Sequence, residues 1–153
     1  MRPAAATRAC FFSVGARRYA LDASRLVRVA EVGELTRVPR TGPELLGLFA
    51  QRGQVMPLID LHPIVGLEQD DLRPSLAALV QARTSTFALN LEVVLGFAPL
   101  GKLEPLTVSV DTSSHVSPKG PCLRGYTTFE DEPAWVLNLD VLADTLGERL
   151  QAA

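Results

Sequence analysis

The stretch Leu46–Leu61, which reads LGLFAQRGQVMPLIDL, decides the fold because it contains two apolar runs separated by a tight turn. Glycine favours the backbone conformations that a two-residue turn requires. We therefore predict strands over Leu45–Gln51 and Gln54–Leu61, joined at Arg52 and Gly53 into a β-hairpin.

The second strand of this hairpin carries the continuous apolar run Val55–Ile59. Such a run predicts a strand covered on both faces. Pro57 lacks a backbone N–H, which indicates an edge position or a bulge. The residues expected in the core are Val27, Val29, Val55, Leu58, Ile59, Trp135, Val136 and Leu137.

Short apolar runs bounded by turn residues recur on both sides of the hairpin, which is typical of an all-β barrel or sandwich with one continuous domain. The leader is expected over residues 1–8, the domain over 9–148 and a tail over 149–153. Further strands are predicted over Cys10–Val14, Arg18–Asp22, Leu26–Ala30, Ser75–Ala82, Thr86–Leu95, Leu106–Val110, Cys122–Phe129 and Pro133–Leu139, with a connection over Gly96–Pro105 and a helix over Val141–Leu150 capped by Asp140.

A weak internal repeat predicts two similar barrels. Gly47 lies thirteen residues before Asp60, and Gly125 lies thirteen residues before Asn138. In both copies the glycine precedes a strand, a turn and a second strand. We also expect Asp60 to cap the turn that follows its strand.

Composition argues against two classes of partner. The net charge is -2 and the arginines are scattered, whereas nucleic-acid binding needs clustered cations. No apolar stretch approaches the ~20 residues of a membrane helix, so direct membrane insertion is not expected. Cys10 and Cys122 are expected as small buried apolar residues, although a disulfide is possible.

Reactive side chains do not form a convincing catalytic set, and no metal or cofactor is expected. His62 and His115 are the only histidines, and both are predicted to lie in loops. A triad of Asp111, His115 and Ser113 or Ser114 can be written on paper, but neighbouring loop residues rarely align for catalysis. We therefore expect a protein that is not an enzyme and that acts through its surface and strand edges.

The hairpin segment Leu46–Leu61 resembles the signature of the CheW-type coupling proteins of chemotaxis. The matching positions are Gly47, Arg52, Gly53, Pro57, Asp60 and Leu61, and weaker similarity extends over about residues 9–148. The resemblance implies two SH3-like five-stranded β-barrels that share one core, with a short C-terminal helix. It also implies a cytoplasmic adaptor, located with receptor arrays at the inner membrane.

The partners implied by the resemblance are the cytoplasmic tip of chemoreceptors and the regulatory domain of a CheA-type histidine kinase. Receptor binding is implied for Ala50, Gln51, Arg52, Gly53 and Arg28. Kinase binding is implied for Leu35 and Val38.

Six residues at four sites depart from the family pattern. Ala50-Gln51 replaces Asn-Leu, His62 replaces arginine, Arg28 replaces a common glutamate, and Leu89-Asn90 stands where Val-Asp is usual. Changed charge can redirect partner choice. An alternative is therefore a coupling protein of a pilus (twitching) or gliding pathway.

Overall fold

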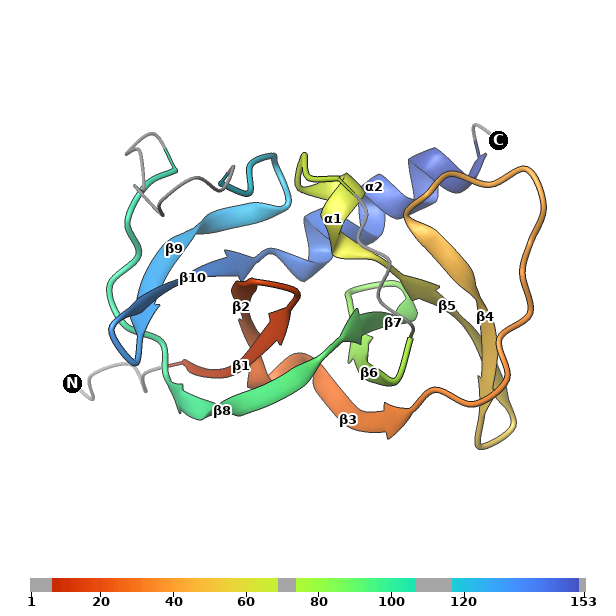
Figure 1. Cartoon of the computed structure of the whole chain (residues 1–153), viewed down its shortest axis with the longest axis horizontal. Coiled ribbons are helices and arrows are strands. Elements are labelled where there is room, and N and C mark those ends of the chain that lie inside the picture. Colours follow the sequence, from red (N-terminus) through yellow and green to blue (C-terminus); the bar gives the residue numbers. More distant parts are fainter. Residues whose placement is uncertain (1–6, 69–73, 107–116, 152–153) are drawn as a thin grey trace.

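The computed structural model describes residues 7–68, 74–106 and 117–151, and these form two five-stranded sheets with helices between them (Figure 1). The predicted pair of SH3-like barrels is confirmed as two SH3-like sheets that do not close completely. The elements are β1 Arg8–Val14, β2 Arg17–Asp22, the 3-10 helix η1 Ala23–Arg25, β3 Leu26–Glu31, β4 Leu45–Gln51, β5 Gln54–Ile59, α1 Leu61–Ile64, β6 Leu76–Gln81, β7 Thr86–Leu91, β8 Val93–Pro99, β9 Leu123–Phe129, β10 Glu132–Leu137 and α2 Leu139–Gln151.

The two sheets have the same topology. Their strand orders are β8-β1-β2-β10-β9 and β3-β6-β7-β5-β4. Each contains one parallel pair, β2 with β10 and β7 with β5, while the other neighbours are antiparallel. The chain begins in the first sheet, builds the whole second sheet and returns to complete the first.

Equivalent glycines mark the internal repeat, which the structure confirms. Gly47 has a φ of 156° and Gly125 a φ of 140°. A Cβ atom at Gly47 would lie 2.8 Å from the carbonyl oxygen of Thr36, and one at Gly125 would lie 2.5 Å from that of Glu104. Isolated bridges pair Thr36 with Leu48 and Glu104 with Tyr126. In each sheet, glycine allows the segment after an edge strand to approach the opposite edge.

The second half of the repeat ends each β-hairpin at a helix N-cap. Asp60 Oδ1 accepts a hydrogen bond from the His62 N–H at 3.1 Å, and Asn138 Oδ1 accepts one from the Val141 N–H at 3.1 Å. The predicted cap at Asp60 is therefore confirmed, whereas the predicted cap at Asp140 is wrong. Asp140 lies in the first turn of α2 and pairs with Arg25 instead.

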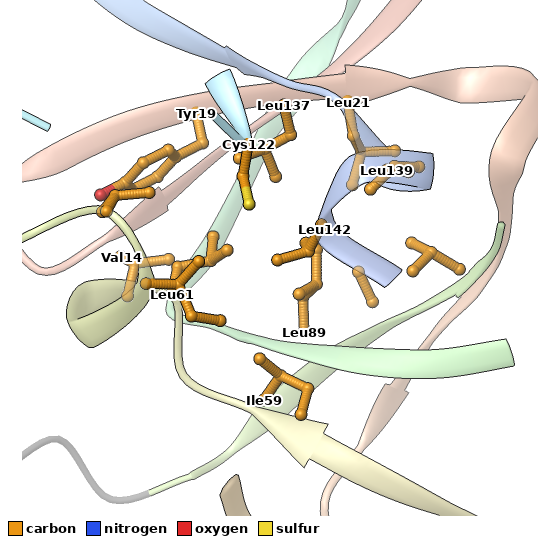
Figure 2. Packing of buried hydrophobic residues seen from close by; sticks show 14 of the residues in the cluster. Val14, Tyr19, Leu21, Ile59, Leu61, Leu89, Cys122, Leu137, Leu139 and Leu142 are labelled. Atoms are coloured by element: carbon orange, nitrogen blue, oxygen red, sulfur yellow. The ribbon is translucent and has the colours of Figure 1, made fainter. Parts of the chain in front are cut away.

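The main core lies between the two sheets and is closed by the helices. Figure 2 shows Tyr19 and Leu21 of β2, Ile59 of β5 and Leu89 of β7 converging with Leu142 of α2. Each sheet also has a smaller cluster on its other face, around Phe11 in the first and around Phe49 in the second.

The expected core is confirmed at Leu58, Ile59, Trp135, Val136 and Leu137, which are all buried. The prediction of the core is wrong for three valines. Val29 is only half-buried, Val27 is 57% exposed and Val55 is 69% exposed. Val27 lies at a register shift in the β3–β6 pairing, and Val55 lies beyond the two residues of β5 that pair with β7.

The predicted strand Thr86–Leu95 is two strands in the structure. The break at Glu92 transfers the chain from β7 in the second sheet to β8 in the first. The predicted connection from Gly96 to Pro105 is therefore wrong at its start, because β8 continues to Pro99. The predicted strand Leu106–Val110 lies outside the described residues except for Leu106, which is in a turn.

Pro57 of β5 faces β4 on one side, opposite Leu48, while the β5–β7 pairing is limited to Leu58 and Ile59. The edge position expected for Pro57 is confirmed at this part of β5, because Pro57 has a neighbouring strand on one side only. The end of β5 at Leu58 and Ile59 lies between two strands. No helix in the described part of the chain is long and apolar enough to cross a bilayer.

Two buried thiols and one buried tyrosine hydroxyl make the stability of the fold sensitive to high pH. Cys10 and Cys122 are free and buried, so the possible disulfide is absent. Burial raises the pKa of both thiols above the ordinary value of 9.0, and burial also raises the pKa of Tyr19.

We therefore expect these three groups to leave the free energy of unfolding unchanged near pH 7 and to lower it as the pH rises through about 9 and beyond. The unfolded chain releases these protons while the folded chain retains them, at a cost of at most about 1.4 kcal/mol per pH unit for each group. Urea unfolding under reducing conditions from pH 7 to 10.5 measures this. The double variant Cys10→Ala/Cys122→Ala should show a smaller decline, and equal declines in the two proteins would contradict the assignment.

Candidate protein-docking surface

The four predicted receptor-binding residues Ala50–Gly53 lie together at the β4–β5 hairpin, which projects from the end of the second sheet (Figure 1). The last strand pair is Gln51 with Gln54. Arg52 has a φ of 49° and Gly53 a φ of 80°. Positive φ at both central residues is typical of a type I′ hairpin turn, which suits glycine at the second position but not arginine at the first.

Arg52 is exposed and, among the described residues, forms no ion pair. A left-handed backbone conformation costs a non-glycine residue about 1 kcal/mol, and such conformations are concentrated at functional sites. The position of Arg52 is thus better suited to contact with a partner than to fold stability.

Replacing Arg52 with asparagine is expected to raise the free energy of unfolding by about 0.5–1 kcal/mol, because asparagine tolerates positive φ. Urea denaturation of the two proteins checks this. A decrease in stability would mean that the guanidinium group contributes to folding in a way the described contacts do not contain.

Arg28, the fifth predicted receptor-binding residue, lies on β3 and pairs with Leu79 of β6. It is half-buried, and no hydrogen bond or ion pair among the described residues links it with the β4–β5 turn. Strands β3 and β4 are the two edge strands of the second sheet. The predicted receptor-binding residues therefore occupy two separate elements.

The predicted kinase-binding residues Leu35 and Val38 lie in the segment between β3 and β4, which runs along β4 (Figure 1). The neighbouring Thr36 exchanges two backbone hydrogen bonds with Leu48 of β4, each 2.8 Å long. Leu35 is half-buried and packs against the smaller hydrophobic cluster of the second sheet, around Phe49. Val38 is half-buried, and its carbonyl oxygen accepts a hydrogen bond from Thr41 Oγ1 at 2.9 Å.

An apolar face of the β4–β5 hairpin adjoins this segment, and sequence analysis missed it. Leu48 pairs with Pro57 and Ala50 pairs with Val55, so the four side chains share one face. Val55 is 69% exposed, Ala50 is exposed, and Leu48 and Pro57 are half-buried. We call Leu48, Val55 and Pro57 the docking face, since Ala50 on the same face belongs to the predicted receptor-binding residues. The sequence did contain a signal for this exposure, because residues next to the tip of a predicted hairpin are seldom covered by other elements.

The family model of the CheW-like domain matches residues 8–146. The chain belongs to the CheW-like domain family. Its fold is similar to that of the scaffolding protein CheW from Thermoanaerobacter tengcongensis, with a TM-score of 0.73, 20% identity, and coverage of 92% of this chain and 89% of that one. No curated protein sequence matches the chain.

The CheW-like signature residues have distinct structural roles. Gly47 allows Leu35 and Thr36 to approach β4, and Gly53 provides positive φ in the turn. Asp60 caps α1. Arg52 is the signature residue whose side chain has no such role among the described contacts, which leaves it available for recognition.

His62, which replaces the arginine of the CheW-like signature, is a correction to the sequence analysis. It is 2% exposed in α1 and not in a surface loop, and its Nδ1 lies 3.3 Å from Asp60 Oδ1. A short helix that carries the apolar residues Leu61, Ile64 and Val65 into the core carries His62 with it. Together with the Asp60 cap, this buried pair fixes the start of α1.

The described residues contain no group of three His, Cys, Asp or Glu side chains arranged to hold a metal ion. The triad considered from sequence, Asp111, Ser113 or Ser114 and His115, lies outside the described residues. The structure does describe an exposed apolar hairpin face beside Arg52, which forms no ion pair among the described residues.

Proposed function

We propose that this protein is a non-enzymatic adaptor that couples chemoreceptors to a CheA-type histidine kinase. The observation that carries the proposal is the docking face, where Val55 is 69% exposed on a CheW-like domain. Exposed apolar surface in a folded monomer is typical of a site for another protein. The protein would act in the cytoplasm, at receptor arrays beside the inner membrane.

The kinase partner is the regulatory domain, and its proposed contact is the docking face with the adjoining residues Leu35 and Val38. Strand β4 is an edge of its sheet, and its bridge with Thr36 extends the apolar surface toward this segment. Leu35 also packs inside the sheet, so its substitution would disturb folding. Val55 is therefore the better position for a test.

The receptor partner is the helical hairpin at the cytoplasmic tip, and its proposed contacts are Ala50–Gly53 and Arg28. An exposed guanidinium at a hairpin turn suits a carboxylate on a helix surface, because Arg–carboxylate pairs are directional. Arg28 would add a second positive charge from β3.

Replacing Arg52 with asparagine is expected to weaken binding of a receptor-tip fragment by about tenfold or more, since charged hydrogen bonds are typically worth ~1.5–3 kcal/mol. Because the same variant should be at least as stable as the wild type, lost binding cannot be attributed to unfolding. Fluorescence anisotropy with a labelled tip fragment measures the affinity. Unchanged affinity would remove Arg52 from the receptor site.

Titration calorimetry with the purified kinase regulatory domain tests the kinase half of the proposal. Saturable one-to-one binding is the expected result. Absence of heat and of complex formation, with a protein shown to be folded, would contradict it.

A second candidate is the same coupling role in a pilus (twitching) or gliding pathway. It is favoured by the departures at Ala50, Gln51, Arg28 and His62, three of which belong to the proposed receptor site. Pull-down from the native organism followed by mass spectrometry separates the two, because the receptor recovered identifies the pathway.

A further inference from the structure

Exposed arginines lie in the segment that adjoins the docking face and at the hairpin turn beyond it. Arg37 follows Thr36, the residue that pairs with Leu48 of the face, and Arg40 lies three residues further along the same segment. Arg52 lies at the hairpin turn between Ala50 and Val55. All three arginines are exposed, and none forms an ion pair with another described residue. We call Arg37, Arg40 and Arg52 the basic rim; Arg52 contributes only its long-range field to it, because its side chain is the proposed receptor contact.

Nearby acids do not neutralise this rim. Glu44 is 5% exposed, and its Oε2 lies 3.6 Å from Arg149 Nη1 of α2. Glu34 is exposed beside Leu35 and offsets one of the three charges. The rim is thus positive although the whole chain has a net charge of -2. A local field of sign opposite to the net charge selects among partners.

Two of the rim arginines are held in a conformation that arginine disfavours. Arg40 has a φ of 63° and Arg52 a φ of 49°. The only other described non-glycine residues with positive φ are Glu130 and Asp131, in the equivalent turn of the β9–β10 hairpin. Equivalent turns of the two sheets therefore carry opposite charges, which shows that backbone geometry does not dictate arginine at this position.

We propose that the partner of the docking face presents an apolar centre bordered by acidic side chains, and that this partner is the kinase regulatory domain. The inference rests on the proposed function and adds the charge of the partner's surface. The apolar centre would hold the complex together, while the basic rim would accelerate its formation and orient it. Rim charges act mainly on association rates and are screened by salt.

Stopped-flow association with the intact protein and the kinase regulatory domain tests this inference at 0.05 M and 0.5 M salt. The variants are Arg37→Glu and Arg40→Asp, since aspartate tolerates positive φ. Arg124→Glu is the matched control, because Arg124 is exposed on β9 of the other sheet and the net charge changes equally. Each rim variant is expected to associate about tenfold more slowly at low salt and about twofold more slowly at high salt.

The control is expected to stay within about twofold of the wild type at both salt concentrations. Rim variants that behave like the control, while the wild type binds normally, would overturn the inference and leave the proposed function intact. Absence of binding by the wild type would contradict both. Charge reversal that abolishes self-association of the chain, with kinase association unchanged, would also overturn it, because the acidic partner would then be the β9–β10 hairpin of a second copy.

Discussion

Replacing Val55 with aspartate is expected to weaken binding to the kinase regulatory domain by at least about 30-fold. A truncated or charged residue at the centre of an interface typically costs 2 kcal/mol or more, and an unpaired carboxylate in an apolar contact adds a desolvation cost. The fold should remain intact, because Val55 is 69% exposed and lies outside the three hydrophobic clusters. Titration calorimetry measures the affinity, and urea unfolding verifies the fold.

Val93→Asp is the matched control for this substitution. Val93 is 48% exposed on β8, an edge strand of the first sheet, so the same chemical change is made away from the docking face. Its affinity should stay within about threefold of the wild type. If Val55→Asp bound as tightly as the wild type, or if both variants lost binding equally, the docking face would be wrong.

Replacing Gly125 with alanine is expected to lower the free energy of unfolding by about 3 kcal/mol or more. The φ of 140° is strained for any residue with a side chain, and the added Cβ would lie 2.5 Å from the carbonyl oxygen of Glu104. Because that oxygen also accepts the Tyr126 N–H at 3.0 Å, the clash would push apart the bridge that links the two edges of the first sheet.

Gly53→Ala measures the cost of positive φ alone, without a steric clash of the added Cβ atom. Gly53 also has positive φ, 80°, but an added Cβ would have no atom within 4 Å. We expect a loss of only about 1 kcal/mol for this variant. Urea denaturation of the two variants checks the difference, and equal losses would show that the close approach of Glu104 does not matter for stability.

Sequence reasoning succeeded where local chemistry alone determines the structure. The Arg52-Gly53 turn, the Asp60 cap and the internal repeat all follow from residue types at fixed spacing. The equivalence of Gly47 and Gly125 was visible as spacing, although their shared role, permitting a close backbone approach, required the fold.

Features that depend on where the chain goes next could not be predicted. The apolar run before Pro99 gave no sign that the chain changes sheets at Glu92, because both strands are apolar. Val55 has the same composition as a core residue, and only the limited pairing of β5 with β7 leaves it exposed. His62 is polar but is buried because α1 turns into the shared core.

The most direct test of the proposed adaptor role is whether this protein joins receptor and kinase in one complex. Receptor cytoplasmic fragments displayed on vesicles are incubated with the full kinase, with and without this protein, and the vesicles are sedimented. Kinase is expected to sediment with the vesicles when the wild-type protein is present, and to stay in solution when Val55→Asp or Arg52→Asn replaces it. Equal recovery of kinase with and without the protein would contradict an adaptor role.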